Sequence, residues 1–179
     1  MRIRLPHTLA VAAAAAIVIS GCGSSKANPA IQPAPSAAQG PVTIPPAITT
    51  PKTGPLAKEP TIAKSSAAAP QKLIVKDIVK GTGATLKVGQ TATVNYVGAT
   101  YPAAKVFDAS WKRGTPAEFQ LMAGALIPGW VQGLPGMRVG GRRELIIPAA
   151  LAYGKPGNSA AGIGPNQPLI FIIDLLGAS

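Results

Sequence analysis

The distribution of aromatic side chains limits where this chain can form a core. All eight aromatic residues lie between Tyr96 and Phe171 of a 179-residue sequence. The segment before them is dense in proline, alanine, serine and threonine, so it carries too little apolar surface to offset the entropy lost on folding. We therefore expect one folded domain over residues 71–179, which is within the usual size of a domain.

The first 21 residues are typical of an export signal. Arg2 and Arg4 form a basic start, and they precede the apolar run TLAVAAAAAIVI. This run is shorter than the roughly 20 residues that a transmembrane helix needs. We therefore predict a cleaved signal peptide over residues 1–21.

A single cysteine follows this signal. The sequence ISGC at residues 19–22 resembles the lipobox of bacterial lipoproteins, which implies cleavage before Cys22 and its acylation by chains such as palmitate. The alternative is an unmodified signal cut near Gly21 or Gly23, which would leave a free thiol. Because Cys22 is the only cysteine, it cannot form an internal disulfide. Two or three acyl chains would hold the protein stably in the bacterial cell envelope, outside the cytoplasmic membrane.

Residues 22–70 are predicted to form a disordered tether between this anchor and the domain. From residue 23 on, this segment holds ten prolines and has no hydrophobic period. Such a composition is typical of semi-rigid or flexible linkers. A spacer through an envelope layer and an unselective tail both fit it.

The formal charge of +11 is spread along the whole chain. It divides as +2 in the signal, +3 in the tether and +6 in the domain. No run of alternating basic and aromatic residues occurs, and GGRRE is too short for a nucleic-acid patch, so we expect no nucleic-acid partner. Anionic lipid or cell-wall polymer is the favoured neighbour, with plain solubility as the alternative.

The residue types of the domain exclude several kinds of catalysis. His7, in the segment to be removed, is the only histidine, so the mature chain has no Ser/His/Asp or Cys/His nucleophile and no imidazole for zinc. The five carboxylates of the domain are scattered, and no phosphate-binding glycine motif occurs. We expect neither a metal nor a cofactor, and any activity should need little acid-base chemistry.

The domain is predicted to be mostly strand. β-Branched segments bounded by glycine or proline predict strands over residues 73–81, 91–99, 105–110, 117–121, 142–148 and 168–176. Only IPGWVQGL, at residues 127–134, favours a short helix, with Pro128 in its first turn and Gly136 past its end. An α+β fold follows, with an antiparallel sheet of five to six strands wrapped around one short helix.

Five separated segments carry a resemblance that covers residues 88–176. In order, they are VNYVG, KVFDASWKRGTP, LIPGWVQGLPGMRVGGRRELIIP, LAYG and IGPNQPLIFIIDLL. In sequence and spacing they are similar to the FKBP-type peptidyl-prolyl cis-trans isomerases. The resemblance implies the same fold, an activity on X-Pro bonds of exported polypeptides, a monomeric domain and possible inhibition by macrolides.

The resemblance also implies a proline-binding pocket. Trp130 would form its floor, Gly129 would let the backbone approach the substrate ring, and Tyr153 would donate its hydroxyl to a substrate carbonyl. Asp108 is expected to pair with Arg113 near Tyr96. The implied catalytic residues are Asp108, Tyr153, Phe107 and Trp130, and the implied substrate-binding residues are Tyr96, Phe119, Leu126, Ile127, Ile163 and Phe171.

Four positions depart from the family pattern. Ala117 replaces a second phenylalanine, Met122 replaces a glycine, and Gly162 and Gly164 replace an apolar residue and a proline in the loop over the pocket. Trp130 could also be an ordinary core residue, and Asp108 with Arg113 an ordinary surface pair. The alternative to an isomerase is a non-catalytic proline-binding chaperone or envelope scaffold.

Overall fold

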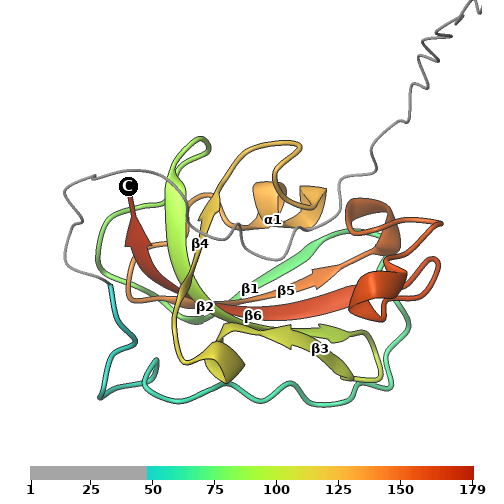
Figure 1. Ribbon diagram of the computed structural model, residues 1–179, viewed down its shortest axis with the longest axis horizontal. Helices are drawn as coiled ribbons and strands as arrows, with labels where there is room; N and C mark the ends of the chain where they lie inside the picture. The colour runs from blue at the N-terminus through green and yellow to red at the C-terminus, as the bar shows by residue number, and fades with distance from the viewer. Residues whose placement is uncertain (1–47) are drawn as a thin grey trace, which may run out of the picture.

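The computed structural model describes residues 48–179 as one six-stranded antiparallel sheet with a short helix on one face (Figure 1). The strand order is β1-β5-β6-β2-β3, and β4 also pairs with β2. The strands are β1 Ile74–Val79, β2 Thr91–Thr100, β3 Val106–Ala109, β4 Ala117–Gln120, β5 Arg142–Ile147 and β6 Leu169–Ala178. The helices are α1 Pro128–Gly133 and the 3-10 turns η1 Ser110–Arg113, η2 Ala149–Leu151 and η3 Ser159–Ala161. The predicted fold class, strands and helix are confirmed.

The central strands β2 and β6 are buried on both faces of the sheet. On the α1 side, Tyr96 and Phe171 join the main core, whereas Ala99 and Ile170 on the opposite side belong to a second apolar cluster. A strand covered on both sides reads as a continuous apolar run, which explains the sequence LIFIIDLL of β6. The sheet therefore needs a cover on the face away from α1.

Helix α1 lies close to the sheet because two of its residues are glycines. A Cβ on Gly129 would lie 2.5 Å from Ile147 Cγ2, and one on Gly133 would lie 2.7 Å from Leu145 Cδ2, both on β5. Real Cβ atoms do not approach other atoms so closely, so a larger residue at either position would force the helix or the β5 side chains to shift. Gly129 thus serves helix-sheet packing in this structure.

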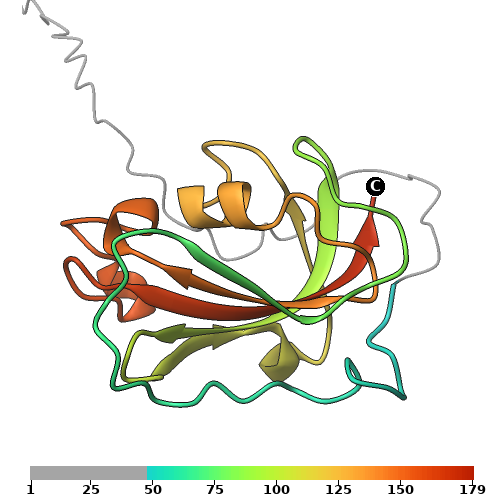
Figure 2. The same ribbon diagram turned by 180° about the vertical axis from the view of Figure 1, so that it is seen from behind.

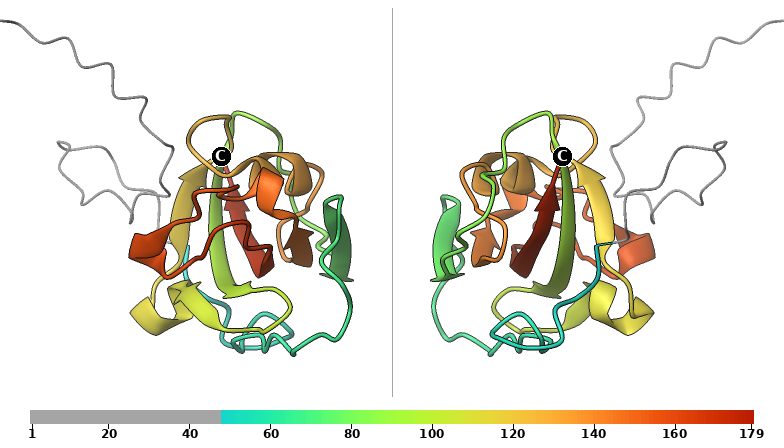
Figure 3. Two further views of the ribbon diagram at one scale, coloured as in Figure 1. Left: turned by 90° about the vertical axis from the view of Figure 1, so that its right-hand side faces the viewer. Right: turned by 90° about the vertical axis from the view of Figure 1, so that its left-hand side faces the viewer.

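Residues 48–70, which we call the strap, differ from the tether predicted for them. The strap lies on the side of the sheet away from α1, as the cyan segment in Figures 1 and 2 and the two end views in Figure 3 show. Leu56 is buried, and Ile62 packs on the cluster of Ala99, Tyr101 and Ile170. The strap therefore supplies the cover that the second face of the sheet needs.

Polar contacts fix the strap at three places along its length. The hydroxyl of Thr50 accepts a hydrogen bond from Asn95 Nδ2 at 2.7 Å, and the carbonyl of Lys58 accepts one from Arg142 Nη2 at 2.8 Å. Ser65 donates its backbone N–H to the carbonyl of Pro102 at 3.0 Å. The folded unit therefore begins at least 23 residues earlier than the sequence predicts, as the range 48–70 shows.

Several predictions concern residues outside the part of the chain that the structure describes. These are the signal peptide at 1–21, the lipidated Cys22 and the tether up to residue 47. Within residues 48–179, no helix is long and apolar enough to cross a bilayer.

Candidate functional site

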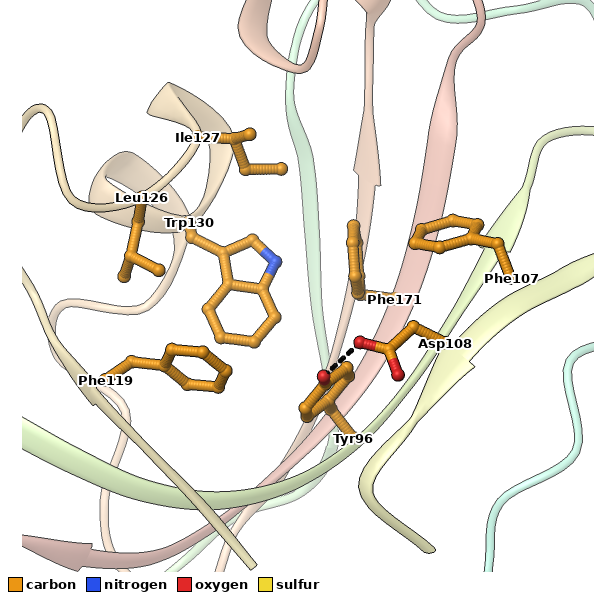
Figure 4. A pocket seen from close by; sticks show the side chains of 8 residues that line it. All are labelled: Tyr96, Phe107, Asp108, Phe119, Leu126, Ile127, Trp130 and Phe171. Carbon is orange, nitrogen blue, oxygen red and sulfur yellow. Dashed lines mark hydrogen bonds between the residues drawn. The ribbon is translucent and has the colours of Figure 1, made fainter. Parts of the chain in front are cut away.

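An open pocket lies between α1 and the concave face of the sheet (Figure 4). Counted out to its mouth, and with the open solvent there included, the pocket holds about 320 Å³. Its lining is apolar apart from one carboxylate and one phenol. The lining residues are Tyr96, Phe107, Asp108, Phe119, Leu126, Ile127, Trp130 and Phe171.

Trp130 stands at the centre of the aromatic residues. The rings of Tyr96, Phe119 and Phe171 approach its indole at centroid distances of 5.6, 5.2 and 5.3 Å, at interplanar angles of 84°, 80° and 86°. Edge-to-face contacts of this kind place the positive edge of one ring on the negative face of another. Three of them from three directions hold the indole in one orientation.

The position of Trp130 follows from the start of α1. Ile127 is the extended N-cap residue, and Pro128 begins the helix, so Trp130 falls in its first turn and faces the sheet. The indole is 4% exposed, and its Nε1–H has no hydrogen-bond partner within residues 48–179. A buried donor without a partner is unusual in a core. The site therefore holds a polar group that the fold itself does not satisfy.

Gly98 on β2 makes room for two walls of the pocket, and it is not among the site residues predicted from the sequence. A Cβ on Gly98 would lie 2.6 Å from Phe171 Cε1 and 2.9 Å from Phe107 Cζ. These two rings stand edge to face, with centroids 5.7 Å apart. The signal in the sequence was a glycine inside a β-branched strand, which often marks a close approach by a neighbouring group.

Asp108, Arg113 and Tyr96 form a closed network at the rim. Arg113 donates to Asp108 Oδ1 at 2.8 Å and to the Tyr96 hydroxyl at 2.9 Å, while that hydroxyl donates to Asp108 Oδ2. The predicted pairing of Asp108 with Arg113 near Tyr96 is confirmed. Both side chains of the ion pair are more than a third exposed, so the pair alone contributes little to stability.

This network fixes the protonation of the rim. Burial, and then the hydrogen bond to Asp108, raise the pKa of Tyr96 to about 12. Burial opposes the charge on Arg113, but its bonds to Tyr96 and Asp108 outweigh that effect and raise its pKa. Tyr96 therefore keeps its proton at neutral pH, and that proton is already donated to Asp108.

Two of the ten predicted site residues are not among the lining residues. Tyr153 is buried beside the pocket, and burial raises its pKa to about 12, against a hydrogen bond to Asn158 and with a contribution from the charge of Asp108. Ile163 is 2% exposed, and its backbone pairs with Asn158 in an isolated bridge. The other eight predicted residues line the pocket together.

The four departures from the family pattern fall into different environments. Ala117 is buried on β4 opposite Val94, and it does not line the pocket. Met122 is exposed. Gly162 ends η3 with φ of 69°, a left-handed conformation that suits glycine, whereas a Cβ on Gly164 would meet nothing within 4 Å. Only Ala117 thus removes bulk from near the aromatic residues.

The lining of this site offers apolar contact and the removal of water. Asp108 is the only carboxylate in the lining, and both of its oxygens accept hydrogen bonds from the rim. Within residues 48–179, no three His, Cys, Asp or Glu side chains lie together in a way that could hold a metal ion. The walls can remove water from an apolar ring and from the amide attached to it.

Comparisons with known proteins place the domain in a family. The model of the FKBP-type peptidyl-prolyl cis-trans isomerase family matches residues 83–176. An FK506-binding protein of Streptomyces anulatus is 54% identical over 107 residues, which cover 60% of this chain and 86% of that protein. A probable FK506-binding protein of Corynebacterium glutamicum is 42% identical over 121 residues, or 68% of this chain and 99% of that protein.

A solved structure shows the same similarity. FkpA from Escherichia coli aligns with a TM-score of 0.55 and 39% identity, over 69% of this chain and 54% of that one. This chain belongs to the FKBP-type peptidyl-prolyl cis-trans isomerase family, and its activity is the cis-trans isomerisation of X-Pro peptide bonds.

Gly98→Ala should displace the Phe107 and Phe171 rings and lower kcat/KM by about tenfold or more. The reason is that the added Cβ would overlap both rings, and overpacking of this kind costs about 1–3 kcal/mol. Isomerase assays and thermal unfolding would measure both effects. Gly164→Ala, which adds the same group in open space, is the matched control. Equal activity of the two variants would contradict the assignment of Gly98 to the pocket.

Proposed function

We propose that the pocket catalyses X-Pro rotation in exported polypeptides by desolvation and shape complementarity. The observation that supports this most directly is the packing of Trp130 among three perpendicular rings, next to a carboxylate whose two oxygens are already engaged. The proline ring would lie on Trp130, between the walls formed by Phe107, Phe119 and Phe171. The preceding amide would then leave water and enter an apolar site.

The reaction itself makes such a mechanism sufficient. Rotation about the X-Pro bond faces a barrier of about 20 kcal/mol because the C–N bond has double-bond character, and no covalent bond breaks in crossing it. The amide dipole falls as the bond twists, so an apolar site disfavours the planar ground state relative to the twisted transition state. Catalysis follows without any proton carrier.

Two hydroxyl-bearing side chains have different roles in this proposal. The Tyr96 proton is donated to Asp108, so Tyr96 orients the rim. Tyr153 lies outside the lining, and its pKa raised to about 12 keeps its hydroxyl protonated. This hydroxyl would donate a hydrogen bond, without proton transfer, to a substrate carbonyl that reaches it as the amide twists. Asp108 holds Tyr96 and Arg113 in place and acts as an orienting group.

A non-catalytic proline-binding module is the second candidate. Ala117 favours it, because this small side chain lies in the same core cluster as Tyr96 and Trp130 and supports the aromatic rings behind the lining less firmly than a phenylalanine would. Binding of macrolides such as FK506, which the names of two relatives mention, fits either candidate, since both keep the pocket. A peptide that binds without faster exchange would identify this second function.

Asp108→Asn should keep the isomerase rate within about tenfold of the wild type, because the amide preserves the shape of the rim and no proton moves. A double variant, Trp130→Leu with Tyr153→Phe, should lose most of the acceleration, since it removes both the floor and the donor. NMR exchange of a short X-Pro peptide measures all three proteins. Circular dichroism would confirm that each variant is folded, and complete loss of activity in folded Asp108→Asn would overturn the mechanism.

We further propose that the enzyme is a monomer held in the bacterial cell envelope by acyl chains on Cys22, outside the cytoplasmic membrane. The lipobox-like sequence ISGC supports the anchor. Since residues 48–70 pack on the domain, only residues 22–47 would separate the anchor from it, with a reach of about 80 Å if they extend as polyproline II. The basic surplus of the chain would favour contact with anionic lipid or cell-wall polymer.

Expression of the whole chain in a bacterial host should give an acylated protein in the membrane fraction. Mass spectrometry of the N-terminal peptide would show acyl chains on Cys22. Cys22→Ser should move the protein out of the membrane fraction, because the acylated residue is then absent. An intact, unmodified Cys22 in the mature wild type would exclude the anchor and favour simple secretion.

A further inference from the structure

We propose that the strap positions the catalytic rim through a buried chain of hydrogen bonds that runs across the sheet from Thr50. The inference rests on the proposed function of the pocket, and it assigns Thr50, Asn95 and Ser110 as positioning residues. None of the three lines the pocket. Their role would be to hold β2 and η1 in the register that the rim requires.

The chain consists of three hydrogen bonds in series. Asn95 Nδ2 donates to Thr50 Oγ1 at 2.7 Å, and Ser110 Oγ donates to Asn95 Oδ1 at 3.0 Å. The backbone N–H of Tyr96 then donates to Ser110 Oγ, also at 3.0 Å. A residue of the strap is thereby connected to the backbone of a residue whose side chain lies in the pocket.

The position of Ser110 relates this chain to the rim. Ser110 is the first residue of η1, which ends at Arg113, and it comes two residues after Asp108. Its hydroxyl fastens that turn to β2 at Tyr96, so a shift of Ser110 would move Asp108 and Arg113 relative to the Tyr96 hydroxyl. Two of the three bonds of the rim network, those made by the Tyr96 hydroxyl with Asp108 and Arg113, span this junction.

Because Asn95 and Ser110 are buried, this series of hydrogen bonds depends on Thr50. Asn95 is 2% exposed and Ser110 is fully buried, so water has little access to replace a lost partner. Within residues 48–179, the amide nitrogen of Asn95 has no other hydrogen-bond partner. With Thr50 as acceptor, the amide must present its oxygen to Ser110. Without the Thr50 acceptor, the Asn95 amide can flip and exchange the positions of its oxygen and nitrogen. The Ser110 hydroxyl then loses the acceptor for its hydrogen bond.

The test compares three substitutions in a protein that comprises residues 23–179 and therefore lacks the signal and Cys22. Thr50→Val keeps the shape of the side chain but removes the acceptor, and Thr50→Ser restores the hydroxyl. Thr49→Val is the matched control, because the neighbouring Thr49 is exposed. The readouts are kcat/KM on an X-Pro peptide, the NMR resonances of the Arg113 guanidinium and the midpoint of thermal unfolding.

We expect Thr50→Val to lower kcat/KM by about three- to tenfold, as is usual for residues that act through a network. The Arg113 resonances should shift in the same variant at a temperature where it is fully folded. Thr50→Ser should recover both properties, and Thr49→Val should change neither.

A lower unfolding midpoint for Thr50→Val, with unchanged kcat/KM and unchanged Arg113 resonances, would overturn the proposal and leave the strap as a cover alone. If the wild type does not accelerate exchange, the proposed function of the pocket fails. The Arg113 resonances still decide the positioning role in that case, since they report the rim without catalysis.

Discussion

The edge-to-face packing of Trp130 against three rings is the interaction on which the pocket depends. Each of the three partners comes from a different strand: Tyr96 from β2, Phe119 from β4 and Phe171 from β6. One side chain on a short helix therefore contacts three strands, whose register the backbone ladders set, and orders their rings around a pocket. A helix of six residues has little stability of its own, so its place on the sheet comes from this packing and from the glycines that let it approach.

The same packing explains how a site without histidine can be a catalyst. The aromatic walls exclude water, and the single carboxylate is occupied by Tyr96 and Arg113. The electrostatic effect on the substrate amide then comes from the apolar pocket itself, where charges and dipoles interact more strongly than in water. An amide that loses its dipole while it rotates is a suitable substrate for such a site.

The sequence predicted the elements of the domain because their patterns are local. β-Branched runs such as LIFIIDLL, and a helix that starts at a proline, can be recognised without knowledge of the neighbours. Eight of the pocket residues could be placed through the family motifs. The strap could not be predicted, because it has no period and only a few anchoring side chains, Leu56 and Ile62 among them. The strap is held by the apolar second face of the sheet. This face forms only when the strands pair, so it cannot be recognised from the sequence. Gly98 was missed for a related reason, since its neighbours Phe107 and Phe171 are distant in the sequence.

If this pocket lowers the barrier without proton transfer, the pH dependence of kcat/KM in H₂O and D₂O will show it. The raised pKa values of Tyr96 and Tyr153 keep both hydroxyls protonated until the pH approaches about 12. The account therefore predicts a flat profile between about pH 6 and pH 9.5 and a solvent isotope effect of about one. A bell-shaped profile in that range, with a clear isotope effect, would mean that a protein group carries a proton, and would contradict the account.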